Sequence, residues 1–164
     1  MPAENATYVA QWEPVPQPDW TIDSNGVLTG VNLNGNTDVV IPNSVTSIGS
    51  YAFKNCTGLT SVTIPNSVTN IVPTAFYGCT KLTSFSVAAD NPNYKDMWGL
   101  LLTKDGKTLV ASPPGCRSVV IPDVVSSIGM CAFKTSEVDG VSMGNGVINI
   151  GFEAFSDCFY LTCI

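Results

Sequence analysis

A pattern that recurs about every 23 residues constrains the fold of this chain more than any other feature. Segment 39–61 reads VVIPNSVTSIGSYAFKNCTGLTS, and segment 62–84 reads VTIPNSVTNIVPTAFYGCTKLTS. The pair Ile-Pro begins at Ile41, Ile64 and Ile121, and the pair Ala-Phe begins at Ala52, Ala75, Ala132 and Ala154. A period of this length is typical of a solenoid, in which each repeat adds one coil and buries its apolar face against the next. Equal positions of successive coils are therefore expected to stack in columns.

Within one repeat, the apolar positions predict a strand followed by a turn. Val62 and Ile64 alternate with polar residues, as they do in a strand that has one face inward. Pro65 ends this strand because it has no N–H group for a ladder. The following residues are expected to turn along the far side of the coil, and segment 73–79 to form about one helical turn. The sequence thus predicts an α/β solenoid with a parallel β-sheet on one face and short helical turns or irregular segments on the other.

Two β-hairpins are expected to interrupt the coils. Asn25-Gly26 and Asp105-Gly106 each lie between two β-prone runs, which indicates a hairpin turn. The prolines before the first run predict an extended N-terminal segment at 1–18, followed by a single repeat domain at 19–164. The parts of this domain are a hairpin at 19–30, coils at about 36–88, a hairpin insertion at about 89–115 and coils at about 116–164. The final LTCI is expected to begin another coil.

The repeat resembles a known family. Its pattern, L-x-x-V/I-x-I-P-x-x-V-x-x-I-x-x-x-A-F-x-x-C, is similar to the BspA-like leucine-rich repeats, also called the Treponema pallidum type, over about residues 36–164. The resemblance implies a right-handed solenoid, usually part of a bacterial or protist surface or secreted protein that binds host proteins or other cells. It carries over no catalytic residue. The last coils depart from the pattern at Val138, Met143-Gly144 and Thr135.

Composition removes several classes of function. The net charge is −6, and the seven Lys and Arg residues are scattered singly, which disfavours nucleic acid and anionic membranes as partners. The chain has no histidine, so Ser-His-Asp and Cys-His catalysis and His-ligated metal sites are absent. We predict no cofactor and no metal. No apolar run is long enough to span a membrane, and the N-terminus lacks the features of a signal peptide. This leaves a cytosolic protein or one whose leader is missing from the sequence, and the family resemblance favours an extracellular or cell-surface location.

The six cysteines allow two interpretations. None forms a C-x-x-C pair, and Cys56, Cys79 and Cys158 occupy one repeat position. They are expected to be buried thiols that act as small apolar groups, although adjacent coils lie about 5 Å apart, which also permits a Cys56–Cys79 disulfide. Cys163 aligns with Ser61 and is expected to be exposed, where it is able to form an intermolecular disulfide.

Carboxylates are the remaining candidates for catalysis. Asp90 and Asp96 lie close together in the sequence, with Tyr94 and Trp98 nearby. A glycoside hydrolase needs only two carboxylates about 5 to 10 Å apart. The same oxygen-rich stretch admits a calcium loop, although it lacks the EF-hand spacing, or an ordinary polar loop rich in turn-forming residues. The polar loop is the interpretation that the sequence favours.

Residues that point outward from the strands define a candidate binding surface. They are mostly small hydroxyl residues, and two aromatic residues of the second insertion lie beside them. The predicted ligand-binding residues are Ser61, Thr63, Ser84, Ser86, Ser118, Ser142, Tyr94 and Trp98. The simpler alternative is a solvated sheet, with the aromatic residues covering an end or a seam of the core.

The sequence therefore predicts a non-catalytic, adhesion-type module of a cell-surface or secreted protein. Its expected partner is a protein or a glycan, without nucleic acid binding or membrane insertion by this part of the chain. The first alternative is an architectural spacer within a larger surface protein, and the remote alternative is a carboxylate-based glycoside hydrolase. End-to-end self-association is a further expectation, because the C-terminal coil has no polar cap.

Overall fold

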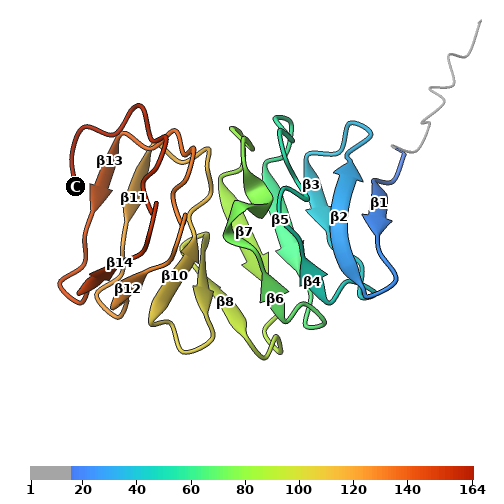
Figure 1. Cartoon of the computed structure of the whole chain (residues 1–164), viewed down its shortest axis with the longest axis horizontal. Helices are drawn as coiled ribbons and strands as arrows, with labels where there is room; N and C mark the ends of the chain where they lie inside the picture. Colours follow the sequence, from blue (N-terminus) through green and yellow to red (C-terminus); the bar gives the residue numbers. More distant parts are fainter. Residues whose placement is uncertain (1–15) are drawn as a thin grey trace, which may run out of the picture.

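The computed structural model describes residues 16–164 and shows coils stacked along one axis (Figure 1). The axis runs from β1 at the N-terminal end to β13 and β14 at the C-terminal end. Most of the predicted Pro-rich segment at 1–18 lies outside the described residues. Within residues 16–164, no helix has the length and hydropathy needed to cross a membrane.

One face of the solenoid carries parallel ladders in the predicted register. Val39 pairs with Val62, and Val62 pairs with Phe85, so equal positions of successive repeats lie side by side. Gly140 also bridges Cys163 in parallel, and the last residues therefore begin another strand of this ladder, as predicted. The strands are β3 (Asp38–Val40), β5 (Ser61–Ile64), β7 (Ser84–Val87), β11 (Ser118–Val120) and β13 (Gly140–Ser142). We call the outward side of these five strands the serine face.

A second set of parallel ladders lines the other side of the coils, where the sequence predicted only turns or irregular segments. Ile48 pairs with Ile71, and Ile128 pairs with Ile150. Each coil adds the same short segment to its neighbour, so two residues per coil suffice to extend the ladder. These strands are β4 (Ser47–Ile48), β6 (Asn70–Ile71), β12 (Ser127–Ile128) and β14 (Asn149–Ile150). We call them the rear ladders.

The α/β class predicted from the sequence is wrong, because the described residues form a mostly β solenoid with one 3-10 helix, η1 (Pro73–Phe76). The reason lies in the residue before each Ala-Phe pair. Tyr51, Cys131 and Glu153 hold φ values of 61°, 56° and 54°, and such left-handed residues interrupt a helix. Only in the second repeat does Pro73 fix a helical φ at the start of the segment. We call segments 50–56, 73–79, 130–136 and 152–158 the Ala-Phe turns.

Antiparallel strands join the coils at two places. β1 (Asp19–Ile22) pairs with β2 (Val27–Asn32), while β9 (Leu100–Thr103) pairs with both β8 (Tyr94–Met97) and β10 (Thr108–Ala111). The strand β8 was not predicted from the sequence. β2 and β10 also pair in parallel with β4 and β12, so both antiparallel units extend the rear ladders.

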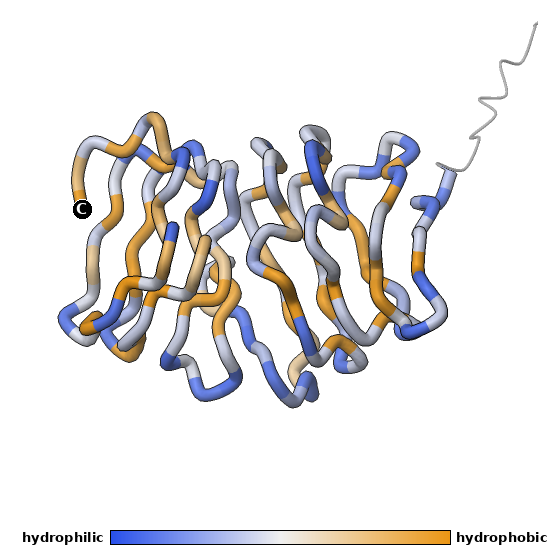
Figure 2. Tube along the Cα trace, in the orientation of Figure 1, coloured by the Kyte–Doolittle hydropathy of each residue, from blue (hydrophilic) through white to orange (hydrophobic). Residues whose placement is uncertain are grey.

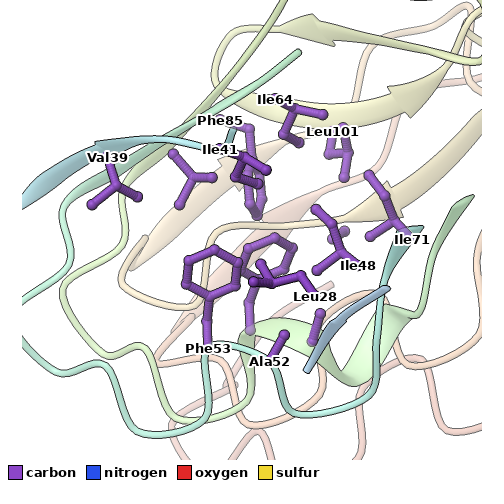
Figure 3. Close-up of a cluster of buried hydrophobic side chains, with 14 of the residues drawn as sticks. Leu28, Val39, Ile41, Ile48, Ala52, Phe53, Ile64, Ile71, Phe85 and Leu101 are labelled. Carbon is purple, nitrogen blue, oxygen red and sulfur yellow. The ribbon is translucent and has the colours of Figure 1, made fainter. Parts of the chain in front are cut away.

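The core fills the space between the two sides of each coil. Figure 2 shows apolar residues along the strands and polar residues at the exposed loops, and Figure 3 shows Phe53, Ile48 and Ile71 converging in the first of two buried clusters. Trp20 packs edge-on against Phe53 with ring centroids 6.2 Å apart. Trp20 thus covers the N-terminal end of the core.

The phenylalanines of the Ala-Phe turns form two stacks and not the single column that the repeat predicted. Phe53 stacks on Phe76, and Phe133 stacks on Phe155, with centroids 5.1 Å and 4.7 Å apart. Between the two stacks, Ser112 takes the hydrogen-bonding place of a phenylalanine, because its N–H donates to the carbonyl of Ala132. The insertion therefore contributes a turn without an aromatic ring, and this divides the core into two clusters.

Candidate functional site

Four of the predicted binding residues lie together on the serine face. Ser61 and Thr63 on β5 pair with Ser84 and Ser86 on β7. The residues between them are buried, so the alternation of the strand points these four side chains outward. The Ser61 hydroxyl donates to the Asp38 carboxylate at 2.6 Å, and this residue is therefore already engaged within the face.

The serine face is interrupted after β7, which the sequence did not predict. The Phe85 N–H donates to the carbonyl of Gly99 at 3.0 Å, and the Val87 N–H donates to Asp96 Oδ1 at 2.8 Å. The connection between β8 and β9 thus occupies the edge of β7. Ser118 and Ser142 belong to the separate ladder of β11 and β13. The predicted surface is consequently divided into two patches.

Trp98 stands at this interruption. Met97 and Leu100 are paired, so Trp98 and Gly99 form a two-residue hairpin turn. Their φ values of 54° and 80° are both positive, which is the signature of a type I′ turn. The backbone of Ser84 lies beside Gly99, since a Cβ built on this glycine would be 3.4 Å from Ser84 Cα. The indole is 72% exposed, and the turn holds it next to the hydroxyl residues of β5 and β7.

Tyr94 lies apart from the other predicted binding residues. Its hydroxyl accepts a hydrogen bond from the Ile71 N–H at 3.1 Å, and its ring packs against the first core cluster. Burial raises the pKa of the Tyr94 hydroxyl, and the hydrogen bond from Ile71 opposes this shift. The Tyr94 hydroxyl thus caps an N–H group at the outer edge of β6, whereas Trp98 is largely exposed to solvent.

The two carboxylates considered for glycoside hydrolysis have different partners. Asp90 accepts a hydrogen bond from Asn66 Nδ2 at 2.7 Å, while Asp96 accepts one from the Val87 N–H. Both contacts tie the loop to neighbouring backbone or side chains of the solenoid. Across residues 16–164, no group of three or more Cys, Asp or Glu side chains is placed to hold a metal ion.

Asn91, between these carboxylates, is fully buried and organises the loop. Its Nδ2 donates to the carbonyls of Pro65 and Val68 at 2.7 and 3.0 Å. Its Oδ1 accepts hydrogen bonds from the N–H groups of Asn93 and Tyr94 at 2.9 and 2.8 Å. The stretch considered as a calcium or catalytic loop is therefore bonded as a structural plug against the preceding coil. Sequence reasoning missed this role of Asn91.

The cysteines are free thiols, so the Cys56–Cys79 disulfide left open by the sequence is not formed. The Cys79 thiol is buried and donates to the carbonyl of Phe53 at 3.0 Å, and the Cys158 thiol makes the same contact with Phe133 at 2.9 Å. Burial, reinforced by the neighbouring Cys56, raises the pKa of Cys79 to about 12. These thiols act as apolar side chains of the core. Cys163 is exposed, as its alignment with Ser61 predicted.

The Ala-Phe turns form an open hollow of about 600 Å³ that sequence reasoning missed. We call it the tyrosine hollow, and it is lined by Tyr51, Lys54, Asn55, Tyr77, Lys134 and Asp157. Lys54, Tyr77 and Lys134 occupy one repeat position, directly after the Phe of the Ala-Phe pair. The repeat was found from the residues that stay the same, so this variable position was passed over. The change from Lys to Tyr to Lys directly after a constant Ala-Phe pair was the signal in the sequence that could have pointed to the hollow.

A second open hollow adjoins the first. It has a volume of about 440 Å³ and is lined by residues 31–37 and 54–58. We call it the amide hollow because Asn32, Asn34, Asn36 and Asn55 are among its lining residues. Lys54 and Asn55 line both hollows, which therefore meet at these two residues.

Comparisons with solved structures find the same fold in bacterial proteins. A leucine-rich repeat protein from Eubacterium ventriosum is 23% identical with a TM-score of 0.66, and the match covers 76% of this chain and 40% of that one. The pneumococcal vaccine antigen PcpA is 21% identical with a TM-score of 0.60, covering 77% of this chain and 38% of that one. A leucine-rich repeat protein from Bacteroides ovatus is 25% identical with a TM-score of 0.51, covering 93% and 40%. The chain spans about two fifths of the length of each of these proteins.

A family model agrees with the repeat found in the sequence. No curated protein sequence matches the chain. The model of the BspA type leucine rich repeat region matches residues 32–96 and 112–164, in six copies, which is more than half of the chain. The unmatched stretch between them includes all of β9 and β10, two strands of the insertion. The chain therefore belongs to the BspA-type leucine-rich repeat family.

Proposed function

We propose that the chain is a non-catalytic interaction module, and that it binds a protein or a glycan through the Trp98 turn and the hydroxyl residues beside it. The observation that carries this proposal is the Trp98 backbone, whose φ of 54° is a conformation that bulky residues rarely adopt. Asn or Gly is the usual residue at the first position of such a turn. A strained residue with an exposed side chain is a common sign of a functional site.

The surroundings of Trp98 suit a shallow contact. Ser84 and Ser86 present small, uncharged hydroxyl groups, each of which both donates and accepts hydrogen bonds. They leave the indole accessible and do not select for charge. Exposed tryptophans supply more binding free energy than other residue types when a partner covers them. A peptide backbone and a sugar both offer the matching polar groups.

Family membership supports a place on a bacterial surface or in a secreted protein. One of the structures with this fold is described as a pneumococcal vaccine antigen, which is the kind of protein that meets a host. Repeat solenoids suit such a role because they offer one long rigid surface to a partner. End-to-end association of two copies stays a prediction. Sedimentation velocity over a range of protein concentrations checks it.

Substitution of Trp98 by Asn tests the proposal, because it restores the usual Asn-Gly turn while removing the indole. The free energy of unfolding is expected to rise by about 1 kcal/mol, since the strain is relieved. Binding to an array of matrix proteins and glycans is expected to weaken about tenfold or more. Phe152→Ala is the matched control, because Phe152 is 74% exposed and lies on the last Ala-Phe turn.

The same experiment separates the module from an architectural spacer. A chain that binds nothing on the array contradicts the proposal and favours the spacer. A chain that does bind, but none of whose ligands binds more weakly after Trp98→Asn, contradicts the proposed Trp98 surface without favouring the spacer. Equal losses in Trp98→Asn and Phe152→Ala contradict it as well, because they indicate nonspecific adhesion through exposed aromatic rings.

A further inference from the structure

The tyrosine hollow offers aromatic surface to a ligand. The rings of Tyr51 and Tyr77 meet edge to face, with centroids 5.7 Å apart and planes at 81°. Tyr51 is 47% exposed even though it is packed against Tyr77. Aromatic rings in this setting have an apolar body and a polar hydroxyl. A sugar ring matches this chemistry, because its C–H groups pack on an aromatic face while its hydroxyls bond at the edge.

The polar side chains around the two tyrosines supply both donors and acceptors. Lys54 and Asn55 contribute N–H groups, and Asn55 and Asp157 contribute oxygens. The Asn55 amide lies against Gly78, where an added Cβ would collide with Asn55 Oδ1. Gly78 has a φ of 73° and no side chain, which leaves room for the Asn55 amide. Donors and acceptors thus line the hollow beside the two tyrosines.

Charges within and beside the hollow offset one another. Lys134 forms an ion pair with Glu153, and Lys54 and Asp157 contribute one charge of each sign. The Lys54 ammonium group lies 5.5 Å from the centroid of the Tyr51 ring, a site that a cationic ligand would need. The hollow therefore has no excess charge to attract an anion and no free aromatic cage for a cation. An uncharged ligand rich in hydroxyls fits this balance best.

The size of the site indicates a chain of sugars. The tyrosine and amide hollows have volumes of about 600 and 440 Å³ and meet at Lys54 and Asn55. Each lies within the range of about 300–1,000 Å³ that is typical of ligand sites. We propose that these two hollows together bind an uncharged oligosaccharide, with Tyr51 and Tyr77 as its packing surface. None of their lining residues is part of the Trp98 turn, so the site goes beyond the function proposed above.

Titration followed by NMR tests this proposal with defined probes. The ¹⁵N-labelled chain is titrated with cellohexaose and with the hexamer of N-acetylglucosamine, and the acidic hexamer of galacturonic acid serves as the charged comparison. At least one uncharged hexamer is expected to shift the amide signals of Tyr51, Asn55 and Tyr77. The same titration with Trp98→Asn is expected to give unchanged shifts, which distinguishes this site from the Trp98 surface.

Two substitutions and one control complete the test. Tyr77→Ala is expected to weaken the affinity for the bound hexamer about tenfold, because it removes one packing surface. Asp157→Asn keeps the left-handed turn, since Asn tolerates a φ near 60°, and is expected to weaken binding about fivefold through the lost carboxylate. Tyr160→Ala, which truncates a tyrosine 56% exposed on the last coil, is expected to have no effect.

Three results overturn the proposal. The first is the absence of shifts at the two hollows with both uncharged hexamers at millimolar concentration. The second is tighter binding of the galacturonic acid hexamer than of either uncharged one. The third is an affinity that Asp157→Asn and a folded Tyr77→Ala both leave unchanged. None of these results bears on binding at Trp98, so the two proposals fail independently.

Discussion

The aromatic rings of Phe53 and Phe76 lie nearly parallel, with centroids 5.1 Å apart and planes at 20°, although they belong to successive coils. Trp20 closes one end of this stack, and Phe85 packs on Phe76 at the other, with centroids 4.8 Å apart. The stack shows why the Ala-Phe pair recurs. Each ring is the packing surface of the next, so the repeat is maintained by the core and needs no reactive group.

Phe76→Ala is expected to destabilise the chain strongly. Phe76 is almost fully buried between two other rings, and truncation of such a residue typically lowers the free energy of unfolding by about 3–5 kcal/mol. Urea denaturation followed by circular dichroism measures the change. Phe159→Ala, at a position 86% exposed, is the control and is expected to change stability by less than about 0.5 kcal/mol. Similar losses in both variants would contradict the assignment of Phe76 to the core.

Asn91→Ala is expected to cost about 3 kcal/mol of unfolding free energy, because it leaves two carbonyls and two N–H groups near Asn91 without partners. Asn43 is an exposed asparagine in the turn after β3, so Asn43→Ala is a matched control expected to be nearly neutral. Thermal or urea unfolding of both variants provides the comparison. An Asn91→Ala variant as stable as Asn43→Ala would show that the loop does not depend on the buried amide.

Stability is expected to decrease at alkaline pH because of Cys79. Its pKa is raised from 9.0 to about 12 in the folded chain, so the folded state favours the protonated thiol. This contribution is fully present below the unfolded pKa of 9.0 and is lost as pH rises through about 12. In urea titrations, the stability difference between the chain and Cys79→Ala is expected to shrink over this window. A constant difference would contradict the burial of a protonated thiol.

Thiol labelling gives an independent check of the cysteine environments. At about pH 8, a thiol reagent is expected to modify the exposed Cys163 rapidly and Cys79 only after unfolding, since the thiolate is the reactive form. Mass spectrometry of the labelled peptides identifies the sites. Rapid labelling of Cys79 in the folded chain would place this side chain outside the core.

Asp38 is expected to titrate below its ordinary pKa of 3.8. Hydrogen bonds from the hydroxyls of Ser61, Thr60 and Thr37, in order of decreasing effect, lower the pKa of this carboxylate. Because the folded pKa is depressed, the associated stabilisation is present above the unfolded value and is lost as pH falls through the folded one. Carboxyl carbon shifts in an NMR titration measure it directly.

Ser61→Ala is expected to raise the pKa of Asp38 toward 3.8, because it removes the hydroxyl with the largest effect. The control is Ser86→Ala on β7, whose side chain is exposed and has no hydrogen bond with Asp38. If Asp38 titrates at 3.8 in the unmodified chain, the hydroxyl groups do not hold the carboxylate.

The sequence predicted the stacking of the coils well because the stacking is encoded in every repeat. Val39, Val62 and Phe85 could be placed in one ladder by counting alone, and the pairing confirms their register. The rear ladders were missed because each coil contributes only two residues to them, which is too short to show alternation. The α/β class failed for a local reason, the left-handed backbone at Tyr51, Cys131 and Glu153, which no periodicity reports.

The candidate site was likewise predictable where it depends on the repeat and not where it depends on the insertion. Counting outward positions located Ser61, Thr63, Ser84 and Ser86 together, because strand geometry alone fixes which way a side chain points. It could not show that the turn at Trp98 returns to the edge of β7 and separates these residues from Ser118, because this depends on where an insertion folds back.

By itself, the sequence of this protein determined which residues are interior and which coils are neighbours. Both follow from burying like side chains against like at a fixed period. Only the tertiary structure decided that Asn91 is a buried plug, that Trp98 is exposed in a strained turn, and that Tyr51 and Tyr77 line one hollow. These features arise between residues that differ from coil to coil, and only packing in space brings such residues together.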